Sequence, residues 1–310
     1  MTALDTAVGS SRGSTPRSQP APPALGHPRR GRAIKDQLAR IIVWAAFLLA
    51  MVPLAWILWT VVTQGYHLLL QAQWWTNSQK GITSRHEGGG AVHAIQGTLI
   101  EGLTTALISV PIGVMTAIYL VEYGRGRFAR AVSFMVDILT GIPSIVAGLF
   151  IYAVWVTTFH FQRVGFAVCL SLVLLMIPVI VRSTEEMLKL VPSELREASY
   201  ALGVPKWKTI VRVVLPTAFS GIITGILLGL ARVMGETAPL LILGPYTKSI
   251  ATDLFSGLIP TLPTMINQDR TESLQPAVDR VWAAALTLIL LVLLLNLAGR
   301  LIARFGSVKK

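Results

Sequence analysis

The chain has 310 residues, of which 53% are apolar and only 14% are charged. Long uncharged runs exclude an ordinary water-soluble domain, because a helix that spans a bilayer needs about 20 apolar residues. The net charge of +12 would suit a nucleic-acid-binding protein, but the basic residues lie between apolar runs and leave no basic-aromatic surface for nucleic acid.

The first segment, residues 1–38, is rich in Pro, Ser, Gly and Arg. This composition predicts a disordered basic cytoplasmic tail. The tail is too long and too polar for the start of a signal peptide. Its cations can contact anionic lipid; they include Arg29, Arg30, Arg32 and Lys35. Residues 39–97 then provide the first transmembrane helix and an extracytoplasmic segment.

Six apolar runs are long enough to cross a membrane, although the fourth has only 18 residues. Backbone groups in hydrocarbon must bond within their own segment, so each run is predicted to be a helix. The chain is therefore expected to be an all-α integral membrane protein with six transmembrane helices. The runs are Ile41–Val62, Gly102–Val121, Ile138–Phe159, Val164–Val181, Val213–Leu243 and Val281–Gly299.

The distribution of Lys and Arg predicts the orientation of these helices. Of the 27 basic residues, 20 lie in the two tails and in the loops after the second and fourth runs, whereas six lie in the opposite loops. Cytoplasmic loops carry the excess of Lys and Arg. We therefore expect a multi-pass protein of the cytoplasmic (inner) membrane with both termini in the cytoplasm.

The loop between the first two runs, residues 64–97, contains Trp74 and Trp75, which we expect at the outer membrane interface. His86 and His93 have no second ligand pair at a metal-binding spacing, so no metal site is predicted. The single cysteine excludes an intrachain disulfide. A phosphate-binding Gly-x-x-x-x-Gly-Lys-Ser/Thr loop is missing as well, so the chain is not expected to hydrolyse ATP or to be an enzyme.

The polar loop at residues 182–216 carries a spaced motif. Ser193 can cap a short helix that Gly203 ends, and Pro205 can restart the chain as a second short helix. A helix, a glycine break and a second helix would form a rigid protrusion for a partner's groove. The alternative is an amphipathic helix that lies on the membrane surface.

The spacing of this loop resembles the EAA loop of ABC-importer permeases, which receives force from an ATPase subunit. That pattern is EAA, three residues, Gly, nine residues and Ile-x-Leu-Pro, and every interval matches here. Ser199 replaces the second Ala, and Val213 replaces Ile. The resemblance makes residues 98–310 a permease core and assigns ATPase coupling to Glu197, Ala198, Ser199, Gly203, Leu215 and Pro216.

The fifth run contains two charged residues, Arg232 and Glu236, which are four positions apart and can pair on one helical face. Ionisable residues at membrane depth are costly and usually mark a pathway. The alternative is a permanent internal ion pair that only makes both charges tolerable. Pro239 is expected to disrupt the helix just past Glu236.

Three glycines share the helical stripe of this charged pair, at positions Gly221, Gly225 and Gly229. A row of small residues lets another helix approach closely. We therefore expect the stripe to pack against protein and the charged pair to line the interior of the subunit.

Further stretches resemble permeases of the phosphate importer: Gly113–Gly124, Thr140–Phe150 and Ala231–Leu241. The Gly-Glu-Thr-Ala-Pro-Leu-Leu ending of the last stretch is similar to the PstA-type subunit. The resemblance implies a type I ABC importer permease fold and a phosphate pathway that includes Arg232, Glu236 and Thr237.

The same resemblance implies partners: a homologous PstC-like permease, a PstB-like ATPase dimer that binds the ATP, and an extracytoplasmic PstS-like phosphate-binding protein. No cofactor is implied for this subunit. Two rivals remain. A secondary transporter would show about twice as many helices or visible repeats, and a sulfate or molybdate ABC permease would keep the EAA loop but lack the Gly-Glu-Thr-Ala-Pro ending.

Overall fold

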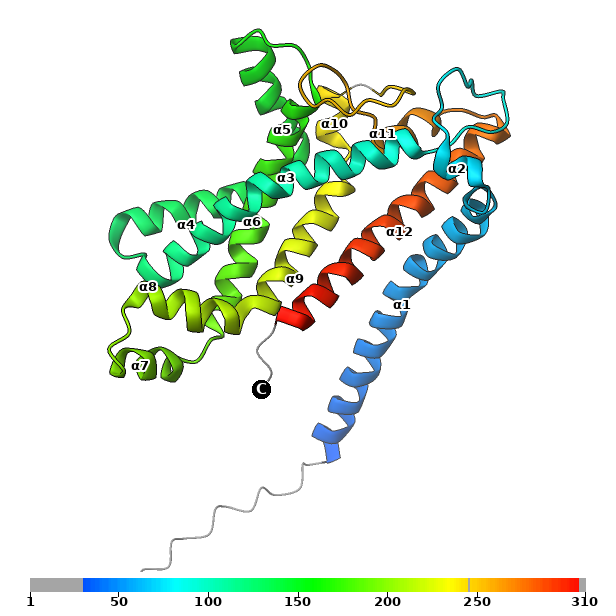
Figure 1. Cartoon of the computed structure of the whole chain (residues 1–310). Coiled ribbons are helices and arrows are strands. Elements are labelled where there is room, and N and C mark those ends of the chain that lie inside the picture. The colour runs from blue at the N-terminus through cyan, green and yellow to red at the C-terminus, as the bar shows by residue number, and fades with distance from the viewer. Residues whose placement is uncertain (1–29, 245, 307–310) are drawn as a thin grey trace, which may run out of the picture. The chain divides into compact units, whose positions relative to one another are not determined.

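The computed structural model describes residues 30–244 and 246–306, with side chains placed from Ile34 to Arg304 apart from residue 245. Every regular element in these residues is helical (Figure 1). The described residues fall into two units, the first ending at Trp56 and the second beginning at Ile57. The elements are α1 (Arg30–Leu69), α2 (Ala72–Thr76), α3 (Val92–Ile118), η1 (Tyr119–Tyr123), α4 (Gly126–Gly141), α5 (Ser144–Ile151), η2 (Tyr152–Thr158), α6 (Gly165–Lys189), α7 (Ser193–Ala201), α8 (Lys206–Thr209), η3 (Ile210–Val214), α9 (Leu215–Met234), α10 (Ala238–Leu243), α11 (Leu262–Asp269) and α12 (Gln275–Gly306).

Helix α1 contains the whole predicted first span, Ile41–Val62, and begins earlier, at Arg30. Its first turns therefore fall within residues 1–38, which the sequence predicts as a disordered tail. The stretch from residue 33 to residue 38 has no Pro or Gly, so it can extend the long apolar helix that follows it. The rest of that tail, with Arg29 and the side chains of Arg30 and Arg32, lies outside the described residues.

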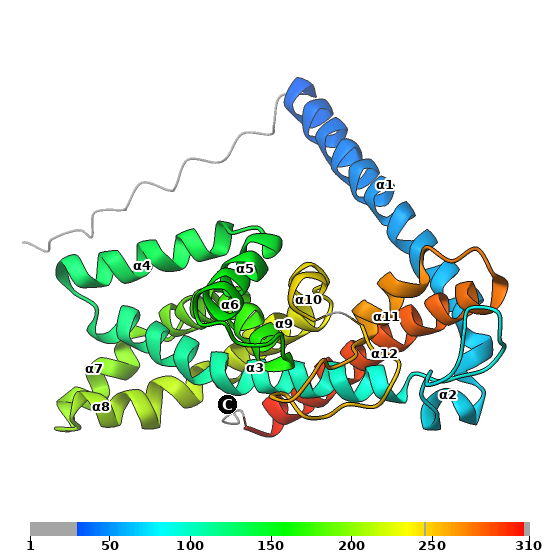
Figure 2. The same ribbon diagram turned by 90° about the horizontal axis from the view of Figure 1, so that it is seen from above.

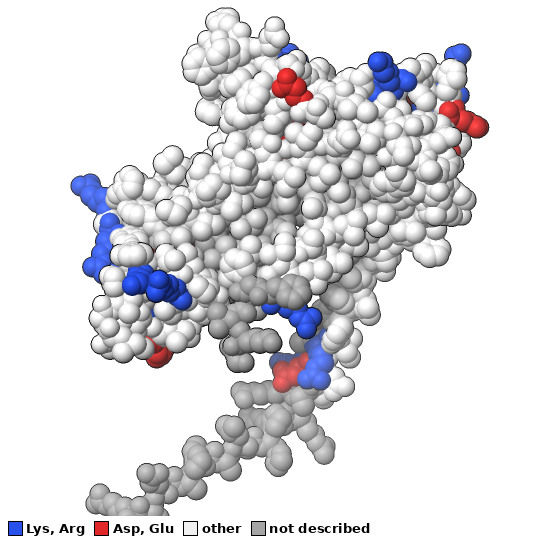
Figure 3. Space-filling view, viewed as in Figure 1, with Lys and Arg blue, Asp and Glu red and all other residues white. Residues whose placement is uncertain are grey.

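Five helical stretches of the described chain are long and apolar enough to cross a membrane, and a bent pair of helices makes up a sixth. The chain is thus an all-α integral membrane protein. The five stretches are Ile34–Leu69, Val92–Tyr123, Gly165–Lys189, Lys206–Met234 and Gln275–Arg304. In Figure 3, the broad middle of the surface carries no charged side chains, and the charges gather towards its margins, as expected for a membrane-embedded belt.

The predicted third span, Ile138–Phe159, is not one straight helix. Helix α4 ends at Gly141, α5 begins at Ser144, and the helical axis bends by 107° between them. Ile142 has extended backbone angles because the ring of Pro143 disfavours a helical conformation in the residue before it. The hydropathy pattern predicts the apolar run but does not predict this bend between α4 and α5.

Helix α6 lies at the centre of the second unit. Of its most apolar stretch 67% is buried, against 22% for α3 and for α12. Figure 2 shows α6 nearly end-on, with α3, α5 and α9 around it. Its apolar side chains form one cluster with residues from α5, α9 and α10, so α6 is the support against which the functional elements are placed.

Residues 64–97 fold against α12 and α11. Trp74 is only 1% exposed, and its indole Nε1 donates a hydrogen bond to Thr287 Oγ1 at 2.9 Å. Trp74 therefore packs inside the protein against α12, whereas Trp75 is 44% exposed. Arg280, which is 2% exposed, pairs with Asp269 at 3.5 Å and holds the same segment through the His86 carbonyl.

Candidate functional site

The charged pair lies where α9 ends. Arg232 is in the last turn of α9, and its Nε lies 3.8 Å from Oε1 of Glu236. The two side chains are exposed to different degrees: 50% for Arg232 and 18% for Glu236. The prediction that the pair lines the subunit interior is therefore wrong for Arg232, which continues the exposed side of α9 marked by Thr224 and Leu228.

The helix break is also placed differently from the prediction. Helix α9 ends at Met234 with Gly235 as its C-cap, and Glu236 lies in the turn before α10. Pro239 does not break α9. It occupies the first turn of α10, where its missing N–H group costs nothing. Thr237, the third residue of the predicted pathway, is the N-cap of α10 and is half-buried.

The glycine row packs against α6 as predicted. A Cβ atom added to Gly221 would lie 2.2 Å from Sδ of Met187, and one added to Gly225 would lie 2.1 Å from Oγ of Ser183. Gly229 is looser, with Met176 Cγ at 3.4 Å from such an atom. Close approach of α9 to α6 therefore requires glycine at the first two positions.

The motif loop has the predicted order of helix, glycine and helix. The N-cap position of α7 is Pro192 rather than Ser193, and no side-chain hydrogen bond caps the helix. Gly203 has φ +75°, a left-handed conformation that suits glycine after a helix end. The second arm is not a separate short helix: from Lys206 it continues through η3 into α9.

The two arms of the loop are held together and to the end of α3. The hydroxyls of Ser199 and Thr209 are 2.8 Å apart and buried. Arg196 pairs with Glu122 of η1 at 3.1 Å and donates to the Leu188 carbonyl at 2.9 Å. Lys206 donates to the Glu122 carbonyl. These contacts make the loop a rigid extension of the helical core.

The outward surface of the loop is apolar and open. Leu202 is 83% exposed, Trp207 is 61% exposed and Leu195 is 42% exposed. A hollow of about 550 Å³ lies between the arms and is lined in part by Ala198, Gly203 and Pro205. Glu197 is exposed on α7, and Leu215 and Pro216, half-buried, begin α9. Such a rigid, partly apolar protrusion is suited to docking with a partner.

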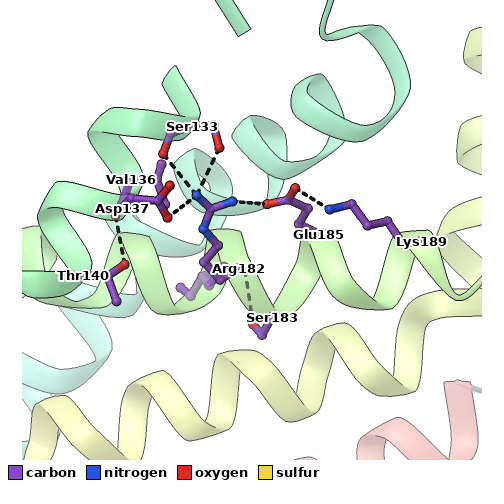
Figure 4. A network of polar contacts seen from close by, with 9 residues as sticks. Ser133, Val136, Asp137, Thr140, Arg182, Ser183, Glu185 and Lys189 are labelled. Carbon is purple, nitrogen blue, oxygen red and sulfur yellow. Dashed lines mark hydrogen bonds and ion pairs between the residues drawn. The ribbon is translucent and has the colours of Figure 1, made fainter. Parts of the chain in front are cut away.

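A polar network fastens the bent helix α4 to α6, close to the start of the loop (Figure 4). Arg182 of α6 pairs with Asp137 of α4 and donates to Ser133 Oγ at 3.0 Å. On its other side Arg182 contacts Glu185 at 2.6 Å, and Glu185 in turn contacts Lys189 at 2.7 Å. Arg182, Glu185 and Lys189 are spaced for pairing along one helix, whereas the contact of Arg182 with Asp137 joins two helices and leaves no signal in local spacing.

A further acidic side chain borders the charged pair. Glu101 of α3 is 3% exposed and lines a small cavity together with Glu236. The predicted second span begins at Gly102, so the sequence places Glu101 just outside that span. The structure extends that helix back to Val92 and places Glu101 inside it.

Comparison with known proteins gives consistent results. Residues 109–305 match the family described as "Binding-protein-dependent transport system inner membrane component". The chain is 50% identical over 293 residues to "Phosphate transport system permease protein PstA 1" of Mycobacterium tuberculosis (strain ATCC 25618 / H37Rv), covering 94% of this chain and 95% of that protein. It is 41% identical over 273 residues to "Phosphate transport system permease protein PstA" of Yersinia pestis, covering 87% and 90%.

Solved structures share the fold at low sequence identity. A chain of a bacterial ABC transporter that imports the acidic polysaccharide alginate superimposes with a TM-score of 0.58 at 14% identity, covering 88% of this chain and 98% of that one. A chain of the inward-facing MetNI methionine ABC transporter gives 0.54 at 21% identity, covering 70% and 94%. These structures support the helical arrangement described above.

Proposed function

The chain belongs to the PstA family of phosphate transport permeases, and from this membership we propose that it passes inorganic phosphate inward as one subunit of an ATP-driven importer. The observation that carries the proposal is 50% identity to a PstA protein over 94% of this chain. The rigid loop between α6 and α9 adds the structural element through which an ATPase can act.

A permease of this class works with an ATPase and a binding protein. We propose a PstB-like ATPase dimer, a homologous PstC-like permease and an extracytoplasmic PstS-like phosphate-binding protein as its partners. ATP is bound by the ATPase subunits, and this subunit needs no cofactor. The exposed apolar side chains of the loop, Leu195 and Leu202, support docking of the ATPase at this loop.

Arg232 is the residue that supports phosphate passage most directly. A guanidinium can donate two parallel hydrogen bonds to phosphate oxygens. Half of the Arg232 side chain is exposed, and its 3.8 Å contact with Glu236 is longer than a good hydrogen bond. The guanidinium can therefore exchange the carboxylate for a phosphate as the transporter alternates between outward and inward states. Thr237 follows directly and adds a hydroxyl near the same place.

We place both termini in the cytoplasm. The excess of Lys and Arg in the tails and in the loops after the second and fourth runs supports this orientation. In Figure 1 the C-terminal end of α12 and the α7–α8 loop lie on the same lower side, as a cytoplasmic coupling loop requires. Residues 64–97 and the loop before α11 then face the binding protein.

The test is uptake by the purified complex. The four kinds of subunit are copurified and reconstituted in vesicles, and uptake of labelled phosphate is measured with excess sulfate or molybdate. We expect phosphate-stimulated ATPase activity and uptake that neither competitor reduces. Equal competition by sulfate or molybdate would overturn the assignment to phosphate, and uptake without the ATPase would overturn the assignment to an ATP-driven importer.

A further inference from the structure

Glu101 is a buried acidic residue in a helix that is long and apolar enough to span a membrane. It lies in α3 and is 3% exposed. Its neighbour Gly102 packs so closely that an added Cβ atom would lie 3.0 Å from Met234 Cγ, at the end of α9. Among the residues that the structure describes, no side chain donates a hydrogen bond to the Glu101 carboxyl or pairs with it. Burying an acidic group without a partner is energetically costly, so such a residue usually marks a functional site.

The cavity that Glu101 borders also contains Glu236. It has a volume of about 10 Å³. Its remaining wall includes apolar side chains, among them Leu172, and the threonines Thr98 and Thr261. A space of this size holds one water at most. It is too small for phosphate, so the substrate passes elsewhere, on the exposed side of Arg232. Two glutamate residues, Glu101 and Glu236, border this cavity instead.

The two glutamates have different partners. Glu236 lies 3.8 Å from Arg232, whereas the cavity lining contains no Lys, Arg or His that could pair with Glu101. Two carboxyl groups that border one small, enclosed site do not both ionise readily, because burial and like charge both oppose a second negative charge. The proton therefore belongs on Glu101, and a protonated carboxyl can donate a hydrogen bond to a carboxylate.

We propose that Glu101 is a positioning residue for phosphate passage: as a neutral carboxylic acid it hydrogen-bonds to the Glu236 carboxylate across the shared cavity. The proposal rests on the function assigned above. When Arg232 turns to phosphate, Glu236 loses its cation, and a partly buried carboxylate without a partner is unfavourable. The hydrogen bond from Glu101 stabilises that state and so makes Arg232 available to the substrate.

The first test compares two substitutions in the reconstituted complex. Glu101→Gln keeps the shape and a donor, whereas Glu101→Leu removes the donor. We expect Glu101→Leu to lower phosphate uptake by about tenfold at normal membrane abundance. Glu101→Gln should retain uptake to within about threefold of wild type. Thr105→Val, one turn further along α3 and outside the cavity, is the matched control and should change uptake little.

A double substitution separates positioning from folding. In a Glu236→Gln background no carboxylate remains to be stabilised, so adding Glu101→Leu should lower uptake no further. A full additional loss in this background would overturn the proposal. So would wild-type uptake in Glu101→Leu, or an equal loss in Glu101→Gln and Glu101→Leu.

Infrared spectroscopy of the purified complex tests the proton itself. The carboxylic-acid C=O stretching band should be present in the wild type at neutral pH and should lose one component in Glu101→Gln. An unchanged band would show that Glu101 is ionised and would overturn the proposal even if Glu101→Leu failed to insert. If the wild-type complex took up no phosphate while this component was present, the assigned function would fail and the protonation of Glu101 would stand.

Discussion

Ser199 and Thr209 meet across the Gly203 turn, with their hydroxyl oxygens 2.8 Å apart in a buried site. We expect Ser199→Ala and Thr209→Val each to lower the free energy of unfolding by about 1 kcal/mol, because each leaves one buried hydroxyl without its partner. The double variant should lose less than the sum, since neither hydroxyl remains. Thermal unfolding of the purified complex measures this, and strictly additive losses would contradict the coupling.

Gly203 should be intolerant of β-branched residues. Its φ of +75° is strained for valine and acceptable for asparagine, while the space around an added Cβ atom is open. Gly203→Val is therefore expected to abolish transport although the protein still inserts, and Gly203→Asn should retain most of it. Phosphate uptake normalised to membrane abundance compares the two. Equal losses would show that side-chain bulk, rather than the backbone conformation, is limiting.

Glu197 is exposed on α7 and tests docking of the ATPase. We expect Glu197→Lys to abolish copurification of the ATPase and phosphate uptake, because a reversed charge would repel the groups that receive this carboxylate. Glu194→Lys makes the same change of charge one turn earlier in the same helix and serves as the control. Retained ATPase binding and uptake in Glu197→Lys would contradict a coupling role for this loop.

The contact of Gly225 with Ser183 predicts a sharp positional contrast in α9. An added Cβ atom would approach Ser183 Oγ to 2.1 Å, so Gly225→Leu must push α9 away from α6. Overpacking of this kind costs about 1–3 kcal/mol or more. Ile226→Leu, about 100° around the helix, keeps the side-chain volume and should be tolerated. The measurements are the membrane abundance and thermal stability of both variants. Equal losses in Gly225→Leu and Ile226→Leu would mean that Gly225 does not lie on the face of α9 that packs against α6.

Arg232 and Glu236 should separate transport from stability. Arg232→Gln is expected to reduce phosphate uptake severely and Glu236→Gln to reduce it less, whereas the double variant should fold at least as well as either single variant. Removing one partner leaves an unpaired charge at membrane depth, and removing both leaves none. Labelled-phosphate uptake per unit of membrane protein is the measurement. Near-normal uptake in the double variant would restrict the pair to a structural role.

Much of this fold follows from short-range features of the sequence. Apolar runs predict the positions of α3, α6 and α12, and the interval from Glu197 to Pro216 predicts a loop whose glycine has a left-handed conformation. The four-residue spacing of the glycines predicts the face of α9 that meets α6. These features succeed because helix periodicity and turn chemistry act over a few residues.

Other features depend on contacts between distant segments. Trp74 is buried because Thr287, in the last helix, receives its N–H group, and local composition cannot reveal that partner. The acidic side chain of Glu101 becomes notable only when the end of α9 places Glu236 at the same cavity. The exposure of Arg232 depends likewise on which face of α9 the neighbouring helices cover, and local spacing does not give that.

Helix α3 has a mechanical consequence for the transporter. With η1 it runs from Val92 to Tyr123 without interruption at Pro111, and it touches both functional regions. Glu122 forms an ion pair with Arg196 of the loop. At a rise of 1.5 Å per residue, Glu101 lies about 30 Å from Glu122 along the same helical stretch. We therefore expect a pull on the loop by the ATPase to reach the cavity wall beside Glu236 through this one continuous helix.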